Sequence, residues 1–206
     1  MRTEGSRSRK LSAYFAEAWR AAHPDGVVTY RDLAANPVPH LDIEAFTANF
    51  LAPEDRTPAQ VAARALTETV AGELIAADAI VIGMPLYNFS VPSTLKAWID
   101  RIVVSGLTVG PDGGKLGGRP VTFTSARGGG YGAGAPREGW DHREPWLRHV
   151  LSQVGLTDLT FIDAELTLAR ENPAMLPLDL GGAEDKSLAD AHAAIDELFR
   201  AEAIAS

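Results

Sequence analysis

The amino-acid sequence predicts an α/β domain built around a parallel β-sheet. Residues 79–83 form a continuous apolar, partly β-branched run, which is typical of a parallel strand buried on both faces. Apolar residues then repeat at intervals of three and four positions from Leu95 to Val103, which indicates one face of an amphipathic helix. A loop joins the two segments, so this part of the chain contains the strand and the helix of one α/β unit.

The first predicted element is a helix with a basic, hydroxyl-rich start. Residues 6–10 are polar and basic, and an apolar stripe with helical spacing follows over residues 11–19. Positive charge at a helix N-terminus is disfavoured by the helix macrodipole. An anion seated on the free N–H groups would resolve this conflict, with the hydroxyls of Ser6 and Ser8 as further donors. A solvated basic helix end is the alternative.

The next segments predict a strand, a long connection and a second helix. Residues 27–33 have the composition of a short strand. Residues 36–57 predict a long loop with a short helical turn, and a loop of this length in a compact domain is often functional. We expect Phe46 and Phe50 to be buried against the sheet, with a pocket wall or a dimer contact as the alternative. Residues 58–78 are rich in alanine and predict a helix.

The loop after the strand at residues 79–84 carries the clearest functional signal. Residues 85–93 contain two prolines, two aromatic residues and an asparagine, and they lie at the carboxyl end of a strand, where open α/β sheets bind ligands. Tyr87 and Phe89 lie in a loop, where no helical or strand periodicity explains their aromatic side chains as core residues. Two flat side chains around Asn88 suit a planar heterocycle. The spacing alone leaves an ordinary structural loop open. We expect Ser93 or Thr94 to cap the following helix.

The second half of the chain continues the α/β pattern. Residues 109–118 are rich in turn residues and predict a hairpin or flap. Further strands are expected at residues 120–125 and 159–164, and helices at residues 146–154 and 188–199. His192 lies beside the apolar stripe of the last helix, and we expect a packed or surface histidine there rather than a catalyst.

A glycine-rich loop follows the strand at residues 120–125. Four glycines occur within residues 126–132, and such a loop lets the backbone approach a ligand closely and present its N–H groups. This loop lies at the same edge of the sheet as Tyr87 and Asn88, because the carboxyl ends of parallel strands share one edge. A merely flexible glycine loop is the alternative.

Composition excludes several functional classes. We expect a single domain over residues 1–206, large enough to form a hydrophobic core that is stable without covalent cross-links. The chain has no cysteine, which excludes disulfides, thiolate metal sites and a cysteine nucleophile. A net charge of -8 argues against a nucleic acid or an anionic membrane as the main partner.

His142 and His149 have no carboxylate at ligand spacing, so we expect no metal. The sequence has neither a signal-peptide core nor a membrane-length apolar run, so we expect a cytoplasmic protein.

Several blocks of the sequence resemble one protein family. Residues 85–89 (Pro-Leu-Tyr-Asn-Phe) and 92–101 (Pro-Ser-Thr-Leu-Lys-Ala-Trp-Ile-Asp-Arg) are similar to the signature of the FMN-dependent NADH-azoreductases. The resemblance extends through residues 6–8, 31–34 and 127–129, so it covers essentially the whole chain. It implies a flavodoxin-like homodimer that reduces quinones and azo compounds. NADH would deliver a hydride to the flavin and leave, and the second substrate would then take two electrons.

The resemblance also implies a set of cofactor-binding residues. The FMN phosphate would lie at the first group and the flavin ring at the other two: Ser6, Arg7 and Ser8; Leu86, Tyr87, Asn88 and Phe89; Ala126, Arg127, Gly128 and Gly129. The family commonly has serine before the arginine of the third group, and here that position is Ala126. No side chain is required as an acid or base, so we assign no catalytic residue.

One strand of the implied fold is absent from the predicted elements. A flavodoxin-like sheet has the strand order 2-1-3-4-5, with the phosphate loop after the first strand, but the residues before Ser6 are few and polar. We expect that the natural start lies upstream, and a compromised family member is the alternative. Three other functions stay open: a different flavodoxin-like NAD(P)H reductase, a single-electron carrier, or, because of the short N-terminus, a flavin-deficient protein without enzymatic activity.

Overall fold

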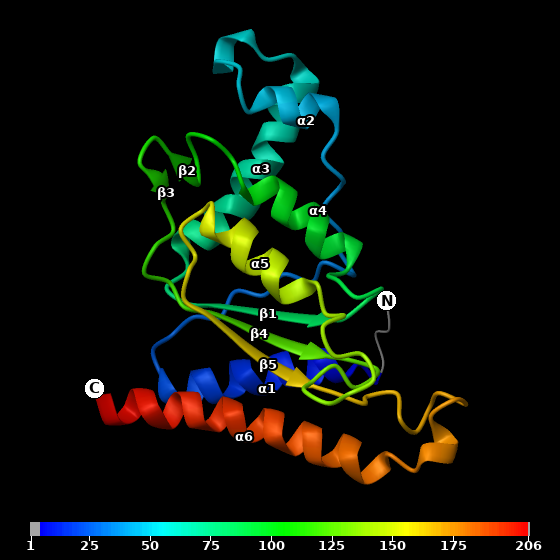
Figure 1. The fold of residues 1–206 in the computed structure, drawn as a ribbon. Helices are drawn as coiled ribbons and strands as arrows, with labels where there is room; N and C mark the ends of the chain where they lie inside the picture. Colours follow the sequence, from blue (N-terminus) through cyan, green and yellow to red (C-terminus); the bar gives the residue numbers. More distant parts are fainter. Residues whose placement is uncertain (1–4, 206) are drawn as a thin grey trace.

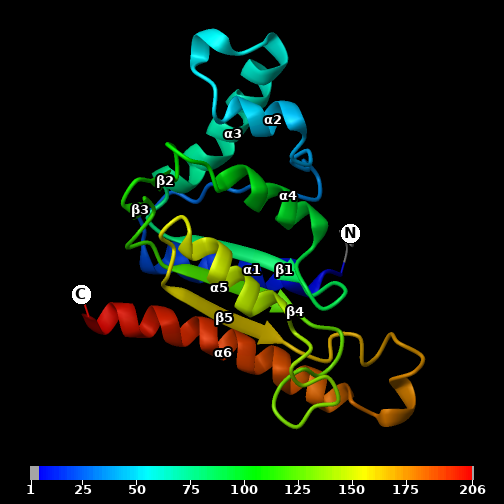
Figure 2. The ribbon, with the colours of Figure 1, turned by 45° about the horizontal axis from the view of Figure 1, so that its top comes forward.

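The computed structural model describes residues 5–205 and has three layers, with a parallel sheet between two layers of helices (Figure 1). The sheet has the order β1-β4-β5, and its three strands are β1 (Ile80–Pro85), β4 (Val121–Ala126) and β5 (Leu159–Ala164). Two helices cover one face: α1 (Arg7–Ala22) and α6 (Gly181–Ala205). Three cover the other: α3 (Pro58–Ala76), α4 (Ser93–Ile102) and α5 (Arg143–Ser152) (Figure 2). The α/β class predicted from the sequence is confirmed.

Each face of the sheet has its own hydrophobic core. On the side of α1 and α6, Leu11, Phe15 and Ile195 pack against Ile162 of β5. On the other side, a larger cluster surrounds the fully buried Phe123 of β4, with contributions from α3, α4 and α5. The central strand β4 is buried along its whole length. The continuous apolar runs in the sequence therefore reflect a sheet that is covered on both faces.

Several smaller elements also agree with the sequence prediction. The long connection after residue 36 contains the predicted helical turn as the short helix α2 (Ile43–Ala48). Two 3-10 turns were not predicted: one follows α2 (Pro53–Asp55) and the other precedes α6 (Leu176–Leu178). The predicted hairpin is present as β2 (Val109–Gly110) paired antiparallel with β3 (Gly113–Gly114). His192 packs edge-on against Tyr14, with its Nδ1 2.7 Å from the carbonyl oxygen of Leu188. This is the structural environment that we expected for it.

The predicted strand at residues 27–33 was wrong. The segment joins no β-ladder within residues 5–205, and ion pairs of its side chains hold it instead. Arg9 of α1 makes two hydrogen bonds of 2.8 Å with the Asp32 carboxylate, and Arg31 donates to Glu73 of α3. A strand needs a backbone partner as well as a suitable composition, and the described part of the chain has no strand before α1 that could supply one.

Two smaller predictions also need correction. Phe46 and Phe50 are not buried against the sheet; they are 49% and 67% exposed. The helix α2 packs on α3 and buries Ala45 and Ala48, which leaves Phe46 outside this contact, and Phe50 lies beyond the end of α2. The cap of α4 is Pro92 rather than Ser93 or Thr94, since the Pro92 carbonyl accepts the first helical hydrogen bonds.

The order of the described strands matches the 3-4-5 part of a flavodoxin-like sheet. The described residues do not complete the order 2-1-3-4-5, because residues 27–33, expected as its second strand, join no β-ladder. The expectation about the first strand stays a prediction, since it concerns residues outside the described range. No helix within residues 5–205 is long and apolar enough to cross a membrane.

Candidate functional site

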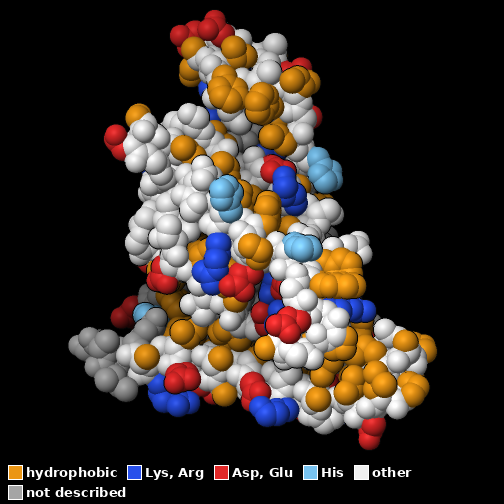
Figure 3. Space-filling model, in the orientation of Figure 1, with side chains coloured by type: hydrophobic (Ala, Val, Ile, Leu, Met, Phe, Trp, Pro, Cys, Tyr) orange, Lys and Arg blue, Asp and Glu red, His pale blue; other side chains and the backbone are white. Residues whose placement is uncertain are grey.

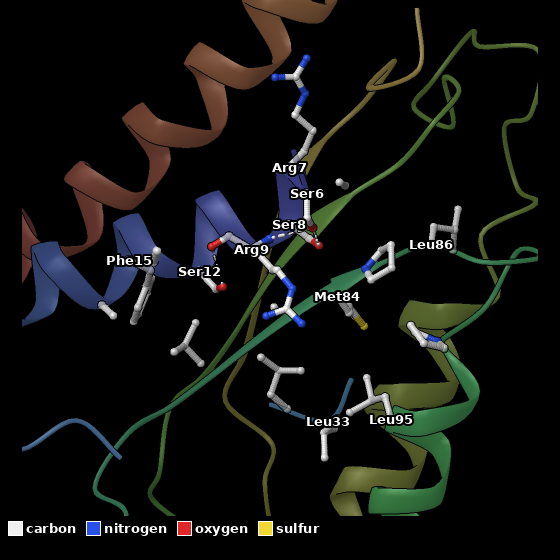
Figure 4. A pocket seen from close by; sticks show the side chains of 18 of the residues that line it. Ser6, Arg7, Ser8, Arg9, Ser12, Phe15, Leu33, Met84, Leu86 and Leu95 are labelled. Carbon is white, nitrogen blue, oxygen red and sulfur yellow. Dashed lines mark hydrogen bonds between the residues drawn. The ribbon is translucent and has the colours of Figure 1, made fainter. Parts of the chain in front are cut away.

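One large cavity of about 2610 Å³ opens at the carboxyl ends of the strands and continues along the edge of β1 that pairs with no strand in the described chain. Its walls come from segments that are far apart in the sequence: residues 6–9, 27–34, 76–87, 128–131 and 165–168. Figure 4 shows Ser6, Ser8, Met84 and Leu86 around this space. The cavity exceeds the usual size of a single small-molecule pocket, because it combines the end of the sheet with the groove beside β1.

The start of α1 contributes hydroxyl and N–H donors to the cavity. Ser6 is the N-cap, and its Oγ accepts from the N–H of Arg9 at 3.4 Å. The hydroxyls of Ser6 and Ser8 lie 3.3 Å apart on the cavity wall (Figure 4). The N–H groups of Arg7 and Ser8, in the first turn, have no acceptor within the helix. These groups together suit a phosphate or another small anion.

Two basic side chains near this helix start, those of Arg7 and Arg9, are already paired with carboxylates. The guanidinium of Arg7 points away from Arg9 in Figure 4 and pairs with the buried Glu184 of α6 at 2.9 Å. Arg9 pairs with Asp32, and its hydrogen bond lowers the Asp32 pKa well below the usual range. The charge conflict inferred from the sequence is thus resolved largely by carboxylates. The hydroxyl and N–H groups remain as the donors for an anion.

The loop after β1 forms a tight two-residue turn at the rim of the cavity. Tyr87 and Ser90 exchange backbone hydrogen bonds of 3.0 and 2.9 Å, while Asn88 and Phe89 both have left-handed φ values of 46° and 65°. Asparagine tolerates this conformation better than phenylalanine does. The turn is held from outside by the ring of Trp140, edge-on to Phe89, and by the N–H of His142, which donates to the Phe89 carbonyl at 2.9 Å.

The glycine-rich loop after β4 lies beside this turn. The Leu86 N–H donates to the Ala126 carbonyl at 3.0 Å, which ties the two loops together. A Cβ atom added at Gly129 would lie 2.9 Å from Nη1 of Arg137, and one added at Gly128 would lie 2.7 Å from Leu168. Both positions therefore require glycine or a shift of the neighbouring side chain. At Gly128 and Gly129 the loop therefore presents backbone rather than side chains to the cavity.

A cluster of charged side chains lies beneath the glycine-rich loop. Arg143 of α5 is completely buried and makes two 2.8 Å hydrogen bonds to Asp163, a hydrogen bond to the Ser125 hydroxyl and a 2.9 Å ion pair with Asp141. Arg127 completes the cluster with contacts of 3.0 to 3.2 Å to three carboxylates: Asp141, Asp163 and Glu165. The Glu165 carboxylate also accepts from the N–H of Tyr131 at 2.8 Å. The cluster thus anchors both ends of the loop.

Burial and the neighbouring charges shift the pKa of Asp163 in opposite directions. Burial alone would raise the pKa of this carboxyl group, but the hydrogen bonds and the charge of Arg143 outweigh it and hold the pKa below its usual value. Asp163 is therefore ionised at neutral pH, and the cluster contains two cations and three anions.

The structure brings most of the predicted site residues together. Eight of them line the cavity: Ser6, Arg7, Ser8, Leu86, Tyr87, Ala126, Gly128 and Gly129. Asn88 and Phe89 lie in the exposed turn beside it, whereas the guanidinium of Arg127 is held in the charge cluster. The geometry therefore favours a contact between a ligand and the backbone of Arg127 over a contact with its side chain.

Sequence reasoning missed the outer wall of the cavity, which is formed by Tyr131, Arg137, Glu165, Leu168 and Met175. Glu165 directly follows β5, so the rule that ligands bind at the carboxyl ends of strands could have found it. The others lie in irregular loops without periodicity. Within the described range, no group of three or more His, Cys, Asp and Glu side chains is arranged to hold a metal ion.

Comparison with known proteins gives a consistent picture. Residues 1–198 match a protein family described by its flavodoxin-like fold. A protein of Frankia casuarinae named FMN-dependent NADH:quinone oxidoreductase is 50% identical over 175 residues, which are 84% of this chain and 83% of the relative.

Solved structures are similar in fold. An azoreductase from Bacillus anthracis superposes with a TM-score of 0.79 at 23% identity, covering 96% of this chain and 94% of the other. An FMN-dependent NADH-azoreductase from the same species, solved in complex with FMN, gives a TM-score of 0.74 at 21% identity, covering 93% and 91%.

Proposed function

The chain belongs to the flavodoxin-like family of FMN-dependent NADH:quinone oxidoreductases, and from this premise we propose that it binds FMN and reduces quinones or azo compounds with NADH. When bound, FMN supplies the redox chemistry: it accepts a hydride from NADH and passes two electrons to the second substrate. The protein contributes binding, orientation and electrostatics. We assign no acid or base among its side chains.

One observation carries this proposal. Three segments that are separate in the sequence, at the starts of α1, of the β1–α4 loop and of the β4–α5 loop, line one cavity at the carboxyl end of the sheet. The groups that they present to the cavity differ in kind. The start of α1 presents hydroxyl and N–H groups, and the two loops present aromatic side chains and backbone groups. This division fits FMN, which has a phosphate at one end and a planar ring at the other.

Each segment has a distinct role in the proposed complex. Ser6 and Ser8, with the first N–H groups of α1, would hold the phosphate. Tyr87 would lie against the ring, and the Asn88 amide would bond its polar edge. The backbone N–H groups of Gly128 and Gly129 would stabilise negative charge that develops on the ring.

Replacing Asn88 with alanine is expected to weaken FMN binding about fivefold, the usual cost of one lost hydrogen bond. Alanine also disfavours the left-handed conformation at this position. Asn88→Gly is the matched control, because glycine keeps that conformation but lacks the amide. FMN titration of all three proteins separates the two causes, and wild-type affinity and rate in both variants would remove Asn88 from the site.

We also propose a homodimer and a cytoplasmic location. An exposed apolar patch at the tip of the molecule supports a self-association surface: Ile43, Phe46 and Phe50 are 69%, 49% and 67% exposed. Orange side chains are visible over this region at the top of Figure 3. The net charge of -8 gives no support to nucleic acid or an anionic membrane as a partner.

A further inference from the structure

Arg137 lies at the outer wall of the cavity, above the glycine-rich loop. Its Nη1 is 3.3 Å from the Tyr131 hydroxyl and would be 2.9 Å from a Cβ at Gly129. Its guanidinium lies 5.7 Å from the centre of the Tyr131 ring. No carboxylate within residues 5–205 forms an ion pair with Arg137, so its charge is available to a ligand.

A second arginine next to the same ring shows the contrast. Arg127 lies 5.8 Å from the Tyr131 ring centre, but three carboxylates compensate its charge. The carboxylate of Glu165, which also lines this wall, is held by Arg127 and by the Tyr131 N–H. Tyr131 therefore separates a compensated arginine inside the protein from an uncompensated one that faces the cavity.

Apolar side chains complete this end of the cavity. Leu168, Met175 and Leu178 line it from the segment between β5 and α6, and Leu168 and Leu178 are 37% and 62% exposed. Figure 3 shows hydrophobic side chains gathered at the lower right, where this segment lies in Figure 1. An apolar wall beside one free cation suits a flat aromatic molecule with an anionic substituent.

We propose that Arg137 gives this site a preference for aromatic electron acceptors that carry a carboxylate or sulfonate group. This inference rests on the proposed function, since it names the substrate class of the same site. The aromatic body contacts Leu168, Met175 and Tyr131, and the anionic group accepts hydrogen bonds from the Arg137 guanidinium. Arg137 is thus a specificity residue, and it takes no part in electron transfer.

A binding experiment tests the proposal without relying on turnover. The FMN-loaded protein is titrated with 2-naphthoate and with the neutral 2-naphthamide, which share the aromatic body and differ in charge. Arg137→Gln is expected to weaken naphthoate binding about fivefold to tenfold and to leave naphthamide binding unchanged within about twofold. Lys186→Gln is the matched control: it removes the same charge from an exposed side chain that does not line the cavity.

A kinetic experiment extends the test to acceptors. The kcat/KM for a sulfonated 1,4-naphthoquinone should fall about fivefold to tenfold in Arg137→Gln, while that for unsubstituted 1,4-naphthoquinone should stay constant. Equal losses for both quinones, or a loss confined to the KM for NADH, would overturn the proposal. If the wild-type protein reduces neither quinone, the proposed function fails. The naphthoate titration, run on the same protein without FMN if none is retained, still decides whether Arg137 binds an aromatic anion.

Discussion

Replacing Arg143 with leucine is expected to lower the free energy of unfolding by about 3 to 5 kcal/mol, the usual cost of removing one partner from a buried ion pair. The completely buried guanidinium of Arg143 binds Asp163 through two hydrogen bonds and also contacts Asp141. Without it, Asp163 keeps only Arg127 and Ser125 as partners among residues 5–205, in a buried position. The measurement is urea unfolding at neutral pH.

Two control variants sharpen this experiment. Arg148→Leu, on the same helix, removes a side chain that is 48% exposed and pairs with Glu144, so it should cost about 1 kcal/mol or less. The double variant Arg143→Leu with Asp163→Leu should recover part of the loss, because it leaves no unpaired charge at the pair. A loss below about 1 kcal/mol for Arg143→Leu alone would contradict the proposed anchoring role of the cluster.

The pH dependence of stability follows from the lowered pKa of Asp163. A carboxyl group with a lower pKa in the folded state contributes stability above its unfolded pKa of about 4 and loses this contribution as the pH falls through its folded pKa. The wild-type protein should therefore lose stability below about pH 4. Asp163→Asn should show a smaller loss over the same range of pH.

Replacing Ser6 with aspartate is expected to weaken FMN binding by about 100-fold, or ~2.7 kcal/mol. The new carboxylate would lie where we place the FMN phosphate, beside the Ser8 hydroxyl, and would repel it. The helix itself should be unaffected, because aspartate is as good an N-cap as serine and its charge suits a helix N-terminus. The affinity for FMN should therefore fall, while the thermal stability of the protein should stay unchanged.

Riboflavin is the decisive control for Ser6→Asp, since it has the same ring without the phosphate. Its affinity should be the same in the wild-type and variant proteins. Lys10→Asp places an aspartate in the same helical turn but outside the cavity wall, and should have a much smaller effect on FMN. An equal loss for FMN and riboflavin would place the phosphate elsewhere.

Much of the fold was predictable because its elements depend on local patterns. The run at residues 79–83 and the stripe from Leu95 to Val103 correspond to β1 and α4, which are buried against one core. The carboxyl ends of parallel strands lie at one edge of the sheet, so the loops of Tyr87 and Gly128 were expected to lie together. Both residues line the same cavity.

Other features depend on long-range contacts that a sequence pattern does not contain. Residues 27–33 have the composition of a strand, yet they have no ladder partner in the described chain. The charge cluster joins Arg127, Arg143 and Asp163, which come from three different elements. That Arg137 has no carboxylate partner among residues 5–205 becomes visible only once the partners of the neighbouring carboxylates are known.

The visible spectrum of the purified protein, after FMN addition and desalting, tests the central claim most directly. We expect retained flavin absorbance that NADH bleaches and that a quinone then restores. A colourless protein after desalting would contradict the proposal that this cavity binds FMN. Retained flavin that NADH leaves oxidised would contradict the proposed reductase activity.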